Sequence, residues 1–150
     1  MIATAELFDT LQREHTLYVD PTLVTDFLPA YEWMRAQMAE RIPGYQGHYP
    51  WWAWRQASEH RDKPDLRARA RYSRYFAPGT PSVRLELEIS DAEVLVSDFD
   101  EWHSVLNHSP LAYSEEEWDH LEHLPEPQRT RAYKRTWPRM FAVQDPPSPL

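Results

Sequence analysis

The longest hydrophobic pattern in this chain has helical spacing and lies over residues 26–42. Its apolar positions are four, three, four and four residues apart, and they are Phe27, Tyr31, Met34, Met38 and Ile42. Such spacing places all five side chains on one face of a helix. Asp26 can cap the start of this helix, and Pro43-Gly44 can end it. We therefore predict a helix over residues 26–41.

Three shorter helices are predicted by their capping residues as much as by their apolar faces. Each begins with a side chain that can accept a hydrogen bond from a free backbone N–H group. These caps are Thr4, before Leu7, Phe8 and Leu11; Ser97, with Asp100 in the reciprocal position; and Ser114, with Glu117 three residues later. The last two pairs have the spacing of a capping box. A final apolar stripe over residues 133–141 is interrupted by Pro138.

A period of two marks the clearest predicted strand, over residues 83–89. Its apolar residues Val83, Leu85, Leu87 and Ile89 alternate with charged ones, which is typical of a strand with one buried face. Shorter apolar runs predict further strands over residues 15–19, 51–54 and 94–96. Helices and strands together predict an α+β fold, in which four to five helices cover a small antiparallel or mixed sheet. We expect one domain over residues 1–142 and a loose, proline-rich tail over residues 143–150.

The composition excludes several classes of site. Three glycines are too few for glycine-rich loops of the Walker or dinucleotide-binding type, and no cysteine is present for a disulfide, a thiol nucleophile or a thiolate zinc site. No apolar run reaches the roughly 20 residues of a membrane span, and residues 1–6 lack the pattern of a secretion signal. We therefore expect a cytoplasmic protein with no membrane partner. No metal is expected either, because the helix face with suitable side chains is acidic and typical of a solvated surface; those side chains are Glu116, His120 and His123.

Charge is strongly segregated along the chain, whose net charge is −8. Residues 55–74 carry seven basic and three acidic side chains, residues 82–126 carry one basic and thirteen acidic ones, and residues 127–141 carry five basic and no acidic ones. These blocks can pair across the fold or be solvated; alternatively, the basic ones form a separate anion-binding face. Residues 67–75 contain regularly spaced arginines with Tyr72 and Tyr75 nearby, as in some single-stranded nucleic-acid sites. The acidity of the chain argues against a nucleic-acid partner.

The densest group of chemistry-bearing side chains lies over residues 97–107. Asp98, Asp100 and His103 are candidate catalytic residues, because carboxylates and imidazole transfer protons near neutral pH. Asp100 and His103 are three residues apart and share a face of the predicted helix, while Asp98 precedes it. The alternative is that Ser97, Asp98 and Asp100 only cap the helix and complement its dipole.

Residues 45–54 form an aromatic segment that is a candidate ligand site. Tyr49, Trp52 and Trp54 can stack a flat ring such as a nucleobase or nicotinamide. Arg55 and Arg67 can hold a phosphate. The alternative is that the tryptophans are core side chains, with Trp52 and Trp54 on one face of a strand.

Several segments carry a resemblance to a known family; they are residues 27–34, 49–54, 63–67, 83–89, 97–103 and 133–141. The chain resembles DUF3841, an uncharacterised bacterial family with no established activity. The arrangement of the family's strands and helices is loosely similar to small ADP-ribosyltransferase-like domains, which is an analogy of fold. The resemblance also implies a further C-terminal strand after residues 137–141, where this chain instead continues into prolines.

Two functions of different classes remain open from the sequence. The first is a small-molecule or nucleotide-binding domain with ADP-ribosyltransferase-like chemistry, for which NAD is a candidate ligand. The second is a non-enzymatic interaction or inhibitor protein of bacterial or phage origin, which would dock on a basic protein partner through an acidic face over residues 86–122.

Overall fold

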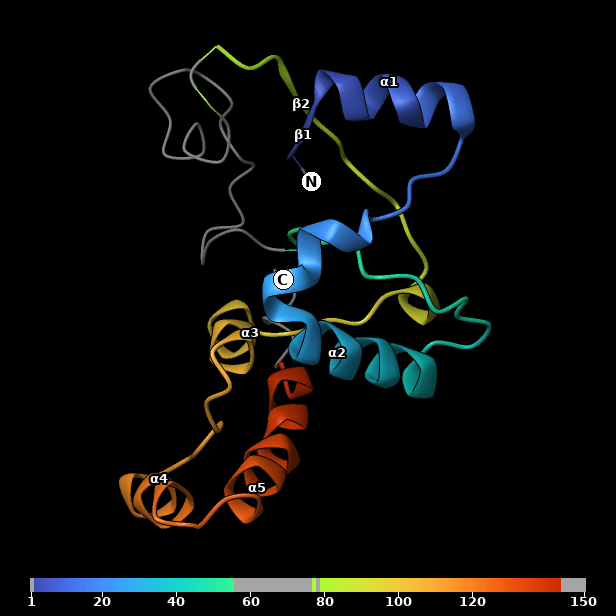
Figure 1. The fold of residues 1–150 in the computed structure, drawn as a ribbon. Helices are drawn as coiled ribbons and strands as arrows, with labels where there is room; N and C mark the ends of the chain where they lie inside the picture. The colour runs from blue at the N-terminus through green and yellow to red at the C-terminus, as the bar shows by residue number, and fades with distance from the viewer. Residues whose placement is uncertain (1, 56–76, 78, 144–150) are drawn as a thin grey trace, which may run out of the picture.

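The computed structural model describes residues 2–55, 77 and 79–143 of the chain. This part contains five α-helices and a two-stranded antiparallel sheet, so the predicted α+β class is confirmed, with helices dominant (Figure 1). The helices are α1 (Ala5–Glu14), α2 (Leu28–Arg41), α3 (Phe99–Leu106), α4 (Glu115–Glu122) and α5 (Gln128–Thr136). The strands are β1 (Ile2–Thr4) and β2 (Ser82–Arg84), and short 3-10 helices are η1 (Pro21–Phe27), η3 (Asp91–Glu93) and η4 (Trp137–Phe141).

The sheet is small and lies against α1. β1 and β2 pair with Ala3 opposite Val83, and Ala3 is buried. Thr4 ends β1 and caps α1, because its Oγ1 accepts a hydrogen bond from the Leu7 N–H at 3.2 Å. The capping role predicted for Thr4 is therefore confirmed.

Helix α2 carries the apolar stripe that its spacing predicts, except for Phe27, which lies in η1 and is exposed. Met34 and Ile42 are buried, and Tyr31 and Met38 are partly buried. The helix begins at Leu28 rather than at residue 26, because the preceding residues form η1. Asp26 is therefore not its cap, and the predicted start was two residues too early.

The hydrophobic core lies between α2, α3 and η4. Its buried side chains are Ala30, Met34, Trp102, Val105, Leu111, Trp137 and Met140. The predicted interruption at Pro138 is real: α5 ends at Thr136, and the chain continues as η4, in which Pro occupies the first turn. Because the helix type changes here, the Trp137 and Met140 side chains point into the core, where they are 1% and 0% exposed. The core is thus made by helices, and the sheet stands outside it.

Three of the predicted strands were wrong, and a fourth was too long. Residues 15–19, 51–54 and 94–96 have no strand conformation, and of the strand predicted over 83–89 only Val83 and Arg84 are paired. An apolar run becomes a strand only where a second strand satisfies its backbone N–H and C=O groups. Residue 15 instead has a left-handed backbone, with φ of 58°, and caps the end of α1. The strand that pairs with β2, Ile2–Thr4, was not predicted.

Helices α4 and α5 pack against each other and extend away from the core (Figure 1). Ser114 and Glu117 cap α4 as predicted, with the Glu117 N–H donating to Ser114 Oγ at 3.1 Å. Glu117 Oε2 accepts a hydrogen bond from the Tyr113 N–H at 2.8 Å. Thr136 ties α5 back to the core, because its buried hydroxyl oxygen accepts from the Leu111 N–H at 2.8 Å.

Candidate functional site

Long-range contacts fix the aromatic segment of residues 45–54 in place. The Trp51 indole N–H donates to the Leu17 carbonyl at 3.2 Å, and the Tyr18 ring lies 4.5 Å from that of His48. Arg35 of α2 donates from Nε to the Gly47 carbonyl at 2.8 Å. The segment is therefore held by side-chain contacts to two other parts of the chain, without a sheet.

Tyr49 belongs to a polar network on α2. Its hydroxyl donates to Glu32 Oε1 at 2.6 Å, and the Arg35 guanidinium lies 4.9 Å above its ring. Arg35 Nη1 also donates to both oxygens of Glu32, at 2.9 and 3.1 Å. The hydrogen bond from Tyr49 holds the pKa of the Glu32 carboxyl below its ordinary value, and the same bond raises the pKa of Tyr49. Tyr49 is thus paired within the protein.

Trp52 and Trp54 of the segment pack one face on α3 and leave much of their surface exposed. The Trp54 ring lies 4.6 Å from that of Phe99, and the Phe99 ring lies 4.3 Å from that of His103. Trp52 lies 5.0 Å from Trp102 of the core. Trp54 is 36% exposed and Phe99 is 47% exposed. We name Trp52, Trp54, Phe99 and His103 the aromatic patch. These rings are packed on one side only, so Trp52 and Trp54 are not the buried core side chains that the sequence offered as the alternative.

The start of α3 places Asp98 as its cap. Asp98 Oδ1 accepts hydrogen bonds from the Asp100 and Glu101 N–H groups, at 2.9 and 3.0 Å. The cap is therefore Asp98 rather than the predicted Ser97. Asp98 has the capping role that the sequence offered as the alternative to catalysis. Burial, and then the nearby Asp98 charge, raise the pKa of the Glu101 carboxyl.

The other predicted residues of this group face different partners. His103 Nδ1 lies 2.8 Å from the Phe99 carbonyl oxygen, one turn earlier in α3. Asp100 is exposed, and its carboxylate has no hydrogen bond within the described residues. Arg55 directly follows Trp54 and is exposed, whereas Arg67 lies outside the described residues. The structure thus brings Trp54 and His103 to Phe99 of α3 and Trp52 to Trp102 of the same helix, and places Tyr49 with Glu32 instead.

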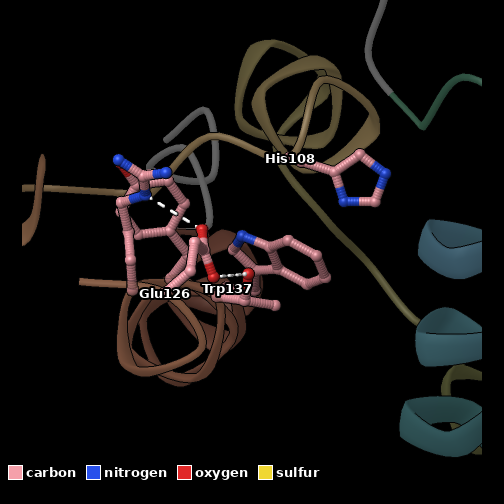
Figure 2. A pocket seen from close by; sticks show the side chains of 6 residues that line it. His108, Glu126 and Trp137 are labelled. Carbon is pink, nitrogen blue, oxygen red and sulfur yellow. Dashed lines mark hydrogen bonds and ion pairs between the residues drawn. The ribbon is translucent and has the colours of Figure 1, made fainter. Parts of the chain in front are cut away.

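A pocket of about 310 Å³ lies elsewhere, between the end of α3 and helix α5 (Figure 2). It is lined by His108, Glu126, Arg129, Thr130, Tyr133 and Trp137. In Figure 2 the His108 ring lies on one side of Trp137, and Glu126 lies on the other. The sequence analysis did not find this group. Five of its members have the spacing of one helical face, and this spacing can be seen in the sequence. Nothing in the sequence joins His108 to them.

The segregated charges pair in part across the fold. Arg139, in the basic block, binds both oxygens of Glu117, in the acidic block, at 2.7 and 2.9 Å. Glu126 and Arg129 form a second pair at 3.0 Å. Four further carboxylates of α4 are exposed and have no ion pair within the described residues: Glu115, Glu116, Asp119 and Glu122. Within the described residues, the acidic block forms ion pairs where it meets α5 and η4, and at Glu86, which pairs with Arg84 at 3.5 Å.

Among the helices in the described ranges, none is long and apolar enough to cross a membrane. The same residues contain no group of three or more His, Asp or Glu side chains placed to hold a metal ion.

Comparison with known proteins places the chain in a family. No curated protein and no solved structure matches it significantly. Residues 4–144, nearly the whole chain, match DUF3841, which is described as a domain of unknown function. The match covers the core helices, the aromatic segment and the pocket. This chain belongs to the DUF3841 family.

Proposed function

We propose that this protein binds a small planar ligand of the nucleobase or nicotinamide class on the aromatic patch. The observation that carries the proposal is the contiguous row formed by Trp54, Phe99 and His103, whose rings lie 4.6 and 4.3 Å apart. Large apolar side chains that remain exposed side by side mark ligand or partner sites more often than isolated ones do. A flat ring stacked on this row would cover the surface that the fold leaves open.

Charged residues that neighbour the patch in the sequence favour a nucleotide among planar ligands. Arg55 follows Trp54 in the chain and supplies a guanidinium suited to phosphate. Arg67 is proposed for the same role on the grounds of sequence. Asp100, whose carboxylate is exposed in the first turn of α3, can accept a hydrogen bond from a sugar hydroxyl. Tyr49 is the least favoured of the proposed ligand residues, because its hydroxyl already binds Glu32 at 2.6 Å.

ADP-ribosyltransferase-like chemistry with NAD would place further demands on the same residues. Of the three proposed catalytic side chains, Asp98 caps α3 with Oδ1 and His103 bonds its own helix through Nδ1. Asp100 therefore fits best the role of the carboxylate that polarises a ribose hydroxyl. We propose nucleotide binding as the primary function, and transfer of ADP-ribose from NAD as a second step that depends on it.

Isothermal titration calorimetry with AMP, nicotinamide mononucleotide and NAD tests the binding proposal. We expect Trp54→Ala to weaken nucleotide binding by about ten-fold or more, because stacking on one aromatic ring contributes roughly 1–3 kcal/mol. Trp118→Ala is the matched control, since Trp118 is 40% exposed on α4, away from the patch. Equal affinities of the wild type and Trp54→Ala, or binding of none of the three nucleotides, would contradict the proposal.

A second candidate function is docking on a basic protein through α4. It rests on four exposed carboxylates without ion pairs in the described structure, beside an exposed Trp118. A polylysine peptide is the probe. We expect its affinity to fall steeply between low and high salt, and to fall again in a Glu115→Gln, Glu116→Gln double variant. The matched control is a Glu6→Gln, Asp9→Asn double variant on α1, which also removes two exposed carboxylate charges from a helix. Salt-independent binding would exclude this function.

A further inference from the structure

We infer that the pocket shown in Figure 2 is a second binding site, specific for a small planar anion of the aryl or heteroaryl carboxylate class. The pocket lies between the end of α3 and helix α5, whereas the aromatic patch joins the start of α3 to residues 52–54. No residue lines both. The inference is therefore independent of the proposed function.

The polar groups of the pocket favour a ligand that accepts hydrogen bonds. The acceptors of Glu126 are occupied, since Oε1 binds Arg129 Nε at 3.0 Å and Oε2 binds the Thr130 hydroxyl at 2.8 Å. The Tyr133 hydroxyl and the His108 ring nitrogens, in contrast, have no hydrogen bond within the described residues. Tyr133 is also partly buried. A phenol O–H and an imidazole N–H left without partners are donors that a carboxylate can satisfy.

The balance of charges around the pocket also favours an anionic ligand. The hydrogen bonds from Thr130 and Arg129 lower the pKa of the Glu126 carboxyl, which therefore stays ionised and balances the Arg129 charge. Lys134 adds a further positive charge, with Nζ 6.0 Å from the centre of the Trp137 ring. No carboxylate is paired with Lys134 in the described part of the chain. The remaining charge at this site is thus positive.

The walls of the pocket favour a planar body. Tyr133, His108 and Trp137 supply three aromatic rings, and the His108 and Trp137 ring centres are 6.1 Å apart. Trp137 is rigidly held, because it is 1% exposed and its indole N–H donates to the Ser109 carbonyl at 2.8 Å. A volume of about 310 Å³ is at the small end of ligand pockets, which suits a molecule of one or two rings.

Nuclear magnetic resonance of the ¹⁵N-labelled full chain tests the charge class directly. The probes are benzoate, benzamide and benzylamine, which share a ring and differ in charge. We expect benzoate at millimolar concentration to shift the Trp137 indole N–H signal, and to bind about ten-fold more tightly than benzamide, since hydrogen bonds to a charged group are the stronger ones. Benzylamine should bind most weakly. No shift at Trp137, or equal affinity for the three probes, would overturn the inference.

Single substitutions test the donors. Tyr133→Phe removes one hydroxyl and keeps the ring, and we expect it to weaken benzoate binding by about ten-fold. Tyr18→Phe is the matched control, because Tyr18 is exposed and lies against His48 instead. His108→Asn removes the imidazole while tolerating the left-handed backbone, with φ of 56°, and should also weaken benzoate. Wild-type affinity in Tyr133→Phe would overturn the site.

Two further variants keep the result interpretable. If Tyr133→Phe fails to fold, Lys134→Gln changes only an exposed charge: benzoate binding should weaken several-fold and benzamide binding should not, and an unchanged benzoate affinity would count against the inference. Trp54→Ala should leave benzoate binding intact. Failure of the nucleotide proposal and failure of this one are therefore separate results.

Discussion

Arg139 of η4 and Glu117 of α4 form a bidentate ion pair, with Nη2–Oε1 at 2.7 Å and Nη1–Oε2 at 2.9 Å. Both residues also bind the segment that precedes α4. Arg139 Nη1 donates to the Leu111 carbonyl and the guanidinium lies 4.1 Å above the Tyr113 ring, while Glu117 accepts from the Tyr113 N–H. This pair therefore fastens the outer helix α4 to the 3-10 helix that enters the core.

The pair makes stability depend on pH in the acid range. The hydrogen bonds from Arg139, and then that from the Tyr113 N–H, lower the pKa of the Glu117 carboxyl to about 2 from an ordinary value of 4.5. A carboxyl whose pKa is lowered by folding stabilises the protein fully above its unfolded pKa and loses this contribution as pH falls through the folded one. We expect the free energy of unfolding of the wild type to exceed that of Glu117→Gln at pH 7, and the difference to shrink from pH 4.5 towards pH 2.

Urea unfolding at several pH values measures this difference. Glu116→Gln is the control on the same helix, because Glu116 is exposed and outside any ion pair of the described structure. Its curve should run parallel to that of the wild type. A Glu117→Gln curve that also runs parallel to the wild type would show that the ion pair does not contribute.

Thr136 is a buried polar residue whose removal should be costly. Its hydroxyl donates to the Tyr133 carbonyl at 2.7 Å and accepts from the Leu111 N–H at 2.8 Å. Thr136→Val keeps the shape but leaves the Leu111 N–H without its partner, which should cost about 1–3 kcal/mol in the free energy of unfolding. Thr10→Val on α1, where the hydroxyl bond to the Glu6 carbonyl is exposed, should change stability by less than about 0.5 kcal/mol. Similar losses in both variants would refute the argument.

Substitution of Asp98 separates capping from chemistry. Asp98→Ala removes two hydrogen bonds at the start of α3 and should lower the free energy of unfolding by about 1 kcal/mol. Asp98→Asn keeps an oxygen that accepts the same bonds, so its melting temperature should stay close to that of the wild type. Nucleotide titration of the Asn variant then isolates the carboxylate charge. A large loss of stability in Asp98→Asn would show that the charge, and not the cap, matters for folding.

Met140 tests the position of the core. It is fully buried in η4, beside Trp137 and opposite α3. We expect Met140→Ala to lower the free energy of unfolding by about 2–5 kcal/mol, because it leaves a cavity, and Met140→Leu to lower it by less than about 1.5 kcal/mol. Thermal and urea unfolding measure both. A mild effect of Met140→Ala would mean that η4 does not enter the core.

Local features of the sequence predicted the helices well. Capping residues and helical stripes act over three or four positions, so Thr4, Ser114 and the Met34 face of α2 could be identified without tertiary structure. The shift of the α3 cap from Ser97 to Asp98 is an error of one residue between two suitable oxygens. The resemblance to DUF3841 was also visible in the sequence and is confirmed over residues 4–144.

What the sequence by itself determined is therefore four of the five helices in the described residues, the family and the residues available for chemistry. Tertiary structure alone decided the strands, because alternation shows which side of a segment is apolar and does not supply the partner that makes it a strand. It also decided the sites. Trp54 meets Phe99, 45 positions later in the chain, and His108 meets the α5 face through a turn with a left-handed backbone. Such contacts depend on how whole helices pack, which no local pattern encodes.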